Sequence, residues 1–208
     1  MSALSHLFDN NRKWADGIKA DDPDFFESSA TGQSPRYLWI GCADSRVPAS
    51  QVVGLGPGEL FVHRNVANMV IETDLNCLTV MRYAIDVLKV RDVLVVGHYG
   101  CGGVQAAYEN TGNGELDHWL CHIREVQKRH HDELEAIADK GARLQRLCEL
   151  NVITQVGNVC RTKIVQQAWQ GGQSLAVHGL VYNLADGLLK NLNCTAEGAT
   201  LVSRDLRE

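Results

Sequence analysis

The sequence has little of the positive charge that binding to nucleic acid requires. Its 208 residues contain 20 Lys and Arg against 25 Asp and Glu, a formal net charge of −5, whereas phosphate binding needs clustered basic side chains. No apolar run approaches the roughly 20 residues of a membrane span. The N-terminus, MSALSHLFDNNRKW, lacks the basic start, apolar stretch and cleavage site of a signal peptide. We therefore expect no nucleic-acid partner and no membrane association.

A disulfide framework is also missing. The seven cysteines are an odd number and are scattered along the chain, rather than spaced as paired cysteines would be. In a chain of this length such usage favours a reducing compartment, where thiols serve in packing or metal binding. The pattern therefore predicts a cytoplasmic protein.

No internal repeat, low-complexity segment or linker divides the chain, so 1–208 is predicted to be a single domain. Helical spacing of apolar residues predicts an amphipathic N-terminal helix that contains Leu4, Leu7, Phe8, Trp14 and Ile18. DDPDFFESSA predicts a second helix, with Asp22 as N-cap and Pro23 at the first helical position. Together, 1–30 would form an N-terminal helical arm.

Beyond the arm, strand and helix patterns alternate. Apolar runs predict strands at 37–42, 60–66 and 92–97. Helical periodicity predicts helices at 73–90, at 101–110 and over 115–170, the last broken near Gly141. Residues 174–192 indicate strand, turn and strand. This alternation predicts an α/β fold with a mostly parallel central sheet flanked by helices.

Two of the predicted strands end in residues that bind metals. YLWIG leads into Cys42, and VLVVG leads into His98, which is followed by Cys101. Ligands gather at the carboxyl ends of strands in open α/β sheets, and neighbouring strands lie only ~4.8 Å apart. Two thiolates and an imidazole suit zinc and leave the fourth position open, as a catalytic site requires. The alternative is a polar loop beside a buried thiol; the other cysteines and histidines lack any comparable pairing.

The segment CADSR places a carboxylate and a guanidinium beside this group. Asp44 and Arg46 follow Cys42 at alternate positions, so an extended backbone would turn all three to one side. We expect Asp44, held by Arg46, to orient the attacking water, and also to be able to occupy the open metal position and close the site. The N–H groups of Gly102 and Gly103, which open a helix, would favour the developing negative oxygen. The alternative for the charged pair is a surface ion pair of little value.

CADSRVP followed by GHYGCGGV resembles the signature of the β-class carbonic anhydrases. LFVHRNVANMV and TDLNCLTVMRYAIDVL also match that family, and the resemblance extends to about residue 205. It is greatest to the bacterial, bicarbonate-regulated type II subgroup. The resemblance implies one Zn²⁺ per subunit, interconversion of carbon dioxide and bicarbonate, and a homodimer that pairs into a tetramer. The chain ends at SRDLRE, so the family's C-terminal helix is expected to be short or missing.

The resemblance also implies a second anion site. Trp39, Arg64 and Tyr182 match the positions that bind bicarbonate in that subgroup. A guanidinium, an indole N–H and a phenol O–H suit a small oxyanion. Bicarbonate bound there would favour the form in which Asp44 occupies the metal. The alternative is that the two aromatic side chains belong to the core and Arg64 only braces the fold.

Three other functions are left open by the residues. A structural zinc module would need a fourth Cys or His, and none stands at diagnostic spacing. A thiol-dependent phosphatase or hydrolase would use Cys42 as nucleophile and Arg46 as anion clamp, although its loop would normally be longer and richer in backbone donors. Relatives that hydrolyse carbon disulfide or carbonyl sulfide would share the zinc ligands.

Overall fold

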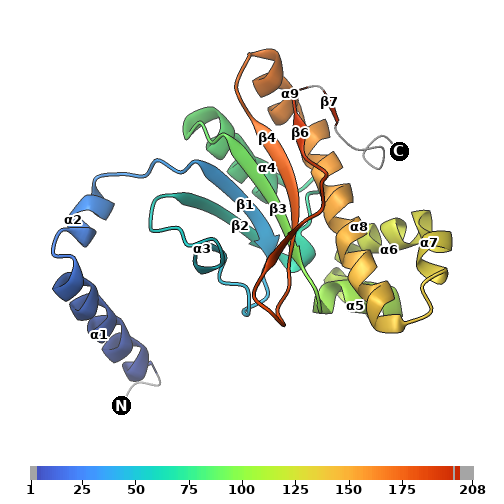
Figure 1. Cartoon of the computed structure of the whole chain (residues 1–208), viewed down its shortest axis with the longest axis horizontal. Coiled ribbons are helices and arrows are strands. Elements are labelled where there is room, and N and C mark those ends of the chain that lie inside the picture. The colour runs from blue at the N-terminus through green and yellow to red at the C-terminus, as the bar shows by residue number, and fades with distance from the viewer. Residues whose placement is uncertain (1–3, 199, 202–208) are drawn as a thin grey trace.

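The computed structural model of the chain describes residues 4–198, 200 and 201. Their strands form one sheet in the order β2-β1-β3-β4-β6-β7, with β5 beside β4 (Figure 1). The strands are β1 (Tyr37–Cys42), β2 (Leu60–Asn65), β3 (Asp92–His98), β4 (Ala176–Tyr182), β5 (Leu189–Asn191), β6 (Ala196–Glu197) and β7 (Thr200–Leu201). The first four are parallel and the last three are antiparallel to their neighbours. The predicted α/β fold with a mostly parallel sheet is confirmed.

The helices precede, connect and cover these strands. They are α1 (Ser5–Asp21), α2 (Phe25–Ala30), α3 (Ala49–Val52), α4 (Leu75–Arg82), α5 (Gly102–Glu109), α6 (Gly114–Arg129), α7 (His131–Glu135), α8 (Lys140–Arg161) and α9 (Lys163–Gln170). A 3-10 turn, Val66–Asn68, follows β2, and a π-helical turn, Tyr83–Val87, continues α4. Among the described residues, no helix is both long and apolar enough to cross a membrane.

Both faces of the parallel strands are buried. Leu38 and Ile40 of β1 pack in one cluster with Met81 of α4 and with side chains of α8 and α9. Trp39, between them in sequence, points to the opposite face and packs with Val96 and the start of α3. Because successive side chains of a strand alternate between faces, a strand buried on both faces has a continuous apolar sequence. That is why YLWIGC indicated a strand.

Helix α8 lies close to the sheet. A Cβ atom at Gly97 of β3 would be 2.5 Å from Cγ2 of Val152, and one at Gly179 of β4 would be 3.1 Å from Cγ2 of Val156. Two neighbouring strands thus carry glycine where they face the helix. This close approach brings polar side chains of α8 up to the loops at the carboxyl ends of the strands.

The N-terminal arm is helical as predicted, but its apolar face is not covered. Figure 1 shows α1 and α2 projecting away from the sheet. Helix α1 buries no residue, and Leu7, Phe8 and Trp14 are more than half exposed. Trp14 meets Phe26 of α2 edge to face, with ring centroids 5.6 Å apart. Periodicity predicted one apolar face correctly, but it does not say what packs against that face.

The predicted start of α2 is two residues too early. The helix begins at Phe25 with Asp24 at the N-cap position, and not at Pro23 with Asp22 as cap. Instead, Oδ1 of Asp22 accepts a hydrogen bond from the N–H of Asp24 at 3.2 Å. The Asp-Asp-Pro-Asp segment therefore forms a turn before the helix, because the Asp22 side chain satisfies the N–H of the N-cap residue itself.

Two further boundaries differ from the prediction. Gly141 does not break a helix; it lies in the first turn of α8, which Asp139 caps by accepting from the N–H of Ala142 at 2.7 Å. The helical region is interrupted instead at His130, at 136–139 and at Thr162. The helix predicted from residue 73 begins at Leu75, after the capping residue Asp74. The expectation of a short C-terminal helix concerns residues 202–208, outside those described.

Candidate functional site

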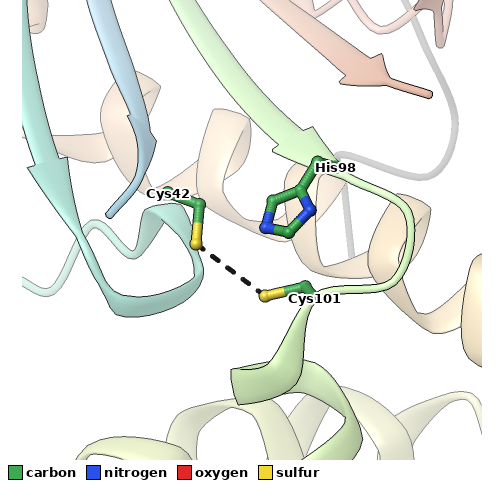
Figure 2. Close-up of side chains that lie close together, drawn as sticks. All are labelled: Cys42, His98 and Cys101. Carbon is green, nitrogen blue, oxygen red and sulfur yellow. Dashed lines mark hydrogen bonds between the residues drawn. The ribbon is translucent and has the colours of Figure 1, made fainter. Parts of the chain in front are cut away.

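The order of the strands creates a ligand-binding edge. The chain runs from β1 to β2 on one side and then returns to place β3 on the other side of β1. In open α/β sheets, such a reversal leaves a crevice at the carboxyl ends of the two strands. Cys42 is the last residue of β1, His98 is the last residue of β3, and Cys101 immediately precedes α5. Figure 2 shows these three side chains pointing toward one another.

The three donor atoms fit a tetrahedral zinc ion. They all lie within 4.8 Å of one another, and the two sulfur atoms are 3.9 Å apart; Zn–S bonds of ~2.3 Å at tetrahedral angles need about 3.8 Å. The side chains of Cys42, His98 and Cys101 are only 5%, 1% and 4% exposed. The Nδ1 atom of His98 hydrogen-bonds to the carbonyl of Tyr99 at 3.0 Å, whereas its buried Nε2 has no hydrogen-bond partner. An imidazole held in this way presents the lone pair of Nε2 to a metal.

The electrostatics of the two sulfur atoms also favour a cation. The hydrogen bond with the Cys101 thiol and the neighbouring His98 imidazole hold the pKa of Cys42 far below its ordinary value. The pKa of Cys101 is strongly raised, because its thiol donates to Cys42 and is buried. Two adjacent buried thiols cannot both ionise at neutral pH. A divalent cation between them removes that restriction, because it attracts both thiolates.

The carboxylate of Asp44 lies beside this group and is held by Arg46. The guanidinium donates from Nε to Oδ1 at 2.9 Å and from Nη2 to Oδ2 at 2.7 Å. Nη2 also donates to the carbonyl of Gly100 at 3.2 Å. Oδ2 is 3.7 Å from Nε2 of His98. The hydrogen bonds from Arg46 keep the pKa of Asp44 well below its usual range. The carboxylate is thus anionic, oriented and within reach of the metal group.

The geometric reason predicted for this arrangement is wrong. Strand β1 ends at Cys42, so no extended backbone carries Asp44 and Arg46 to one side. They meet in a turn, in which the carbonyl of Asp44 accepts from the N–H of Val47 at 3.1 Å. Oδ1 of Asp44 also accepts from the N–H of Arg46 at 2.9 Å. Asp-initiated turns of this kind explain the contact.

The first turn of α5 packs against the Cys101 sulfur and the loop after β2. The first backbone hydrogen bond of the helix runs from Gln105 to the carbonyl of Cys101, so helix geometry supplies no acceptor for the N–H groups of Gly102 and Gly103. A Cβ at Gly103 would be 2.8 Å from Cγ1 of Val66 and 3.8 Å from the Cys101 sulfur. Only glycine fits this approach. Stabilisation of an oxyanion by the two N–H groups stays a prediction.

The three residues predicted for a regulatory anion come from three strands. Trp39 is fully buried, and its Nε1 has no hydrogen-bond partner. The indole lies over Gly41, which pairs in register with Arg64 of β2. Arg64 donates from Nε to the carbonyl of Cys42 at 2.9 Å and from Nη2 to the carbonyl of Asp44 at 2.5 Å. Tyr182 packs against the cluster that contains Trp39. Arg64 therefore ties β2 to the segment 42–44. The buried indole N–H of Trp39 lies nearby without a hydrogen-bond partner.

Sequence reasoning missed a second group of metal-binding side chains. His63, Asp74 and Cys77 have donor atoms within 4.8 Å of one another. The carboxylate of Asp74 already caps α4 by accepting from the N–H of Asn76 at 3.0 Å. Burial raises the pKa of Cys77 to about 12, so its thiol is protonated at neutral pH. Unlike Cys42, this thiol has no hydrogen bond that favours the thiolate, and we assign no metal to the group.

A cleft of about 570 Å³ lies away from the metal group. Residues of α4 line one side of it, and residues around the junction of α8 and α9 line the other. None of the residues predicted for the site belongs to its lining. The polar donors that define a reaction centre are therefore at the sheet edge rather than in this cleft.

Comparison with known proteins agrees with the geometry. Residues 37–189 match the family model described as carbonic anhydrase. A carbonic anhydrase of Emericella nidulans is 51% identical over 192 residues, which are 92% of this chain and 84% of that protein. The chain therefore belongs to the carbonic anhydrase family, and within it to the β class.

Solved structures support the assignment to the β class. The β-carbonic anhydrase of Coccomyxa, solved in complex with acetazolamide, superposes with a TM-score of 0.92 at 42% identity, over 99% of this chain and 95% of that one. A tetrameric β-carbonic anhydrase of Sordaria macrospora gives 0.89 at 36% identity, over 94% of this chain and 100% of that one. The predicted family is thus confirmed. The relatives named here are fungal or algal, and the bacterial subgroup is a separate proposal.

Proposed function

We propose that Cys42, His98 and Cys101 hold one Zn²⁺ per subunit, and that this is where the enzyme hydrates carbon dioxide reversibly to bicarbonate. The observation that carries this is the convergence of three buried donors within 4.8 Å at the edge between β1 and β3. When bound, zinc lowers the pKa of a water molecule and so supplies a nucleophile at neutral pH. Three protein ligands leave a coordination position for that chemistry.

The charged pair completes the proposal. Asp44, fixed by two hydrogen bonds from Arg46, accepts a hydrogen bond from the attacking water and aims its lone pair at carbon dioxide. The fixed carboxylate saves the entropy of orienting the water at the moment of reaction. The N–H groups of Gly102 and Gly103 favour negative charge on the oxygen of the product. The water and carbon dioxide thereby become bicarbonate and one proton; the proton passes to solvent, bicarbonate leaves, and a second water enters.

The proposal is tested by metal analysis together with stopped-flow hydration of carbon dioxide. We expect about one zinc per chain and hydration that disappears when a chelator removes the metal and returns when zinc is restored. Assays with carbon disulfide and carbonyl sulfide separate the related hydrolases, and a phosphatase substrate tests the thiol chemistry of Cys42. Stoichiometric zinc without hydration would reduce the site to a structural one.

Regulation by bicarbonate, as in the type II subgroup, is the finer proposal. The buried Trp39 N–H has no partner, and Arg64 is tied to the carbonyls on either side of Ala43. An anion beside Trp39 and Tyr182 would draw the guanidinium from those carbonyls and release the Asp44 loop. Asp44 would then occupy the fourth position of the metal and exclude water. Departure of Asp44 would admit a water that loses a proton, so alkaline pH would favour the open form.

Replacing Trp39 by phenylalanine is expected to weaken inhibition by bicarbonate about tenfold, as loss of one hydrogen bond to an anion would. In the parent, inhibition should be steeper than one-site competition, because coupled subunits switch together, and strongest at low pH. The measurement is hydration rate against bicarbonate at several pH values in both proteins. Identical, purely competitive and non-cooperative curves would remove the regulatory site.

The remaining proposals concern the domain organisation, the assembly and the cellular location of the enzyme. We infer a single domain that assembles as a homodimer or as a tetramer of two dimers. The exposed Leu7, Phe8 and Trp14 on α1 support this, because an apolar helical face without a cover favours association. Seven free cysteines support a reducing, cytoplasmic location.

A further inference from the structure

We propose that Asn151 of α8 positions the loop after β2, so that Ala67 of this loop packs against Cys42 and Cys101. Asn151 is thus a positioning residue of the metal centre, although it lies on a helix that contributes no ligand. The inference rests on the proposed zinc site.

The loop has a backbone that must be held in place. Ala67 and Asn68 are consecutive non-glycine residues with φ of 63° and 51°, a region that L-residues with a Cβ rarely adopt. Ala67 is fully buried and Asn68 almost so. A backbone in this conformation persists only where surrounding structure over-determines it. The question is therefore which groups hold it.

Buried side chains of α8 supply the restraint. Nδ2 of Asn151 donates to the carbonyl of Ala67 at 3.0 Å, and Oε1 of Gln155 accepts from the N–H of Val70 at 2.9 Å. The two side chains are joined, because Nε2 of Gln155 donates to Oδ1 of Asn151 at 3.1 Å. Both are only 1% exposed. The orientation of each side-chain amide is thus fixed, and α8 holds the loop at Ala67 and at Val70.

A second restraint comes from the strand that leads into the loop. Oδ1 of Asn65 accepts from the N–H of Met69 at 2.7 Å, and its Nδ2 donates to the carbonyl of Met69 at 2.8 Å. This amide sets the width of the turn. It does not reach the carbonyl of Ala67, which Asn151 binds. Asn151 is therefore the α8 side chain that holds the peptide between Ala67 and Asn68, while Nε1 of Trp119 donates to the carbonyl of Val66 at 2.8 Å and holds the preceding peptide.

The loop touches both cysteine segments of the metal group. Ala67 is buried in one cluster with Cys42 and Cys101, and its methyl group would be 3.3 Å from a Cβ at Gly103, two residues after Cys101. Groups around metal ligands fix the direction in which those ligands point. Displacement of this loop would therefore change the aim of the two sulfur atoms and so the binding of the metal.

The experiment compares two neighbours on one helix. Asn151→Leu keeps the side-chain volume but removes the donor to Ala67. Asn158→Ala is the matched control, because Asn158 binds the same loop one step further on, at the carbonyl of Val70 (2.9 Å). Zinc affinity is measured by competition with a chromophoric chelator, and thermal unfolding is followed in both variants. Cobalt(II) is then substituted, and its thiolate charge-transfer absorption is recorded.

We expect Asn151→Leu to bind zinc roughly 10–100-fold more weakly, the range typical of groups that orient metal ligands, and to shift the cobalt charge-transfer band. Asn158→Ala should lose stability with affinity and band unchanged. A role confined to stability would lower the unfolding temperature of both variants and leave both metal readouts at the parent values, which would overturn the proposal.

Asn151→Ser guards against failure of the leucine variant to fold, because its shorter side chain fits but does not reach the Ala67 carbonyl. The same weakening and band shift are expected from it. Zinc affinity and cobalt spectrum equal to those of the parent would overturn the proposal. A parent chain that binds no zinc would instead contradict the proposed metal site itself, so the two failures are distinguishable.

Discussion

Cys101→Ala is expected to abolish stoichiometric zinc binding and, with it, hydration of carbon dioxide. The substitution leaves one thiolate and one imidazole, and the loss of a direct ligand should exceed the 10–100-fold that a supporting residue costs. Cys42→Ala and His98→Ala should do the same, because each supplies one of three convergent donors. Metal content per chain is measured after dialysis against a weak chelator, beside the hydration rate.

The matched control is Cys121→Ser, which changes the one exposed cysteine. It should keep full zinc and full activity. Individual replacement of the buried thiols Cys77, Cys148, Cys160 and Cys194 should also leave the zinc stoichiometry unchanged, at some loss of stability from smaller packing volume. Full zinc content in dialysed Cys101→Ala would show that the ligand assignment is wrong.

Arg46→Ala is expected to keep its zinc and lose roughly 100-fold or more of its hydration rate, the scale of losing one positioned proton acceptor. Without the two hydrogen bonds from Arg46, the carboxylate of Asp44 is free to move toward Nε2 of His98, 3.7 Å away, and to occupy the fourth metal position. The effect on stability should be small, because the Arg46 side chain is 57% exposed and exposed ion pairs contribute little.

Arg46→Lys provides the graded comparison. Lysine keeps the positive charge but cannot make two parallel hydrogen bonds to one carboxylate, so activity should fall between the alanine variant and the parent. Metal content, hydration rate and unfolding temperature are measured on all three proteins. Undiminished hydration by zinc-loaded Arg46→Ala would refute the gating role of this arginine.

The metal group was predictable because its residues sit where periodicity ends. An apolar run that stops at Cys42 and another that stops at His98 indicate two strand ends, and parallel strands bring such ends to one edge. Asp44 and Arg46 were found for a partly wrong reason, because alternation along a strand does not describe the turn that actually joins them.

The loop after β2 was not predictable in the same way. Left-handed backbone at Ala67 has no compositional signal, since glycine or asparagine would be the expected residue there. Asn151, Gln155 and Asn158 recur at helical spacing, but the burial of Asn151 and Gln155 depends on how closely α8 approaches Gly97 and Gly179. Only the packing of helix on sheet turns that polar stripe from a solvated face into part of the site.

The separation of the metal donors along the chain bears on the order of events during synthesis. Cys42 and Cys101 are 59 positions apart, and no local turn or hairpin brings them together. Their approach needs β1 and β3 paired, and the side chains that hold the loop after β2 come from α8, which ends only at Arg161. Non-local pairing of this kind is slow to form, so the three donors converge only after most of the chain has been synthesised. On the proposed zinc assignment, we therefore expect the metal to bind late in folding, and a chain truncated before α8 to bind it weakly.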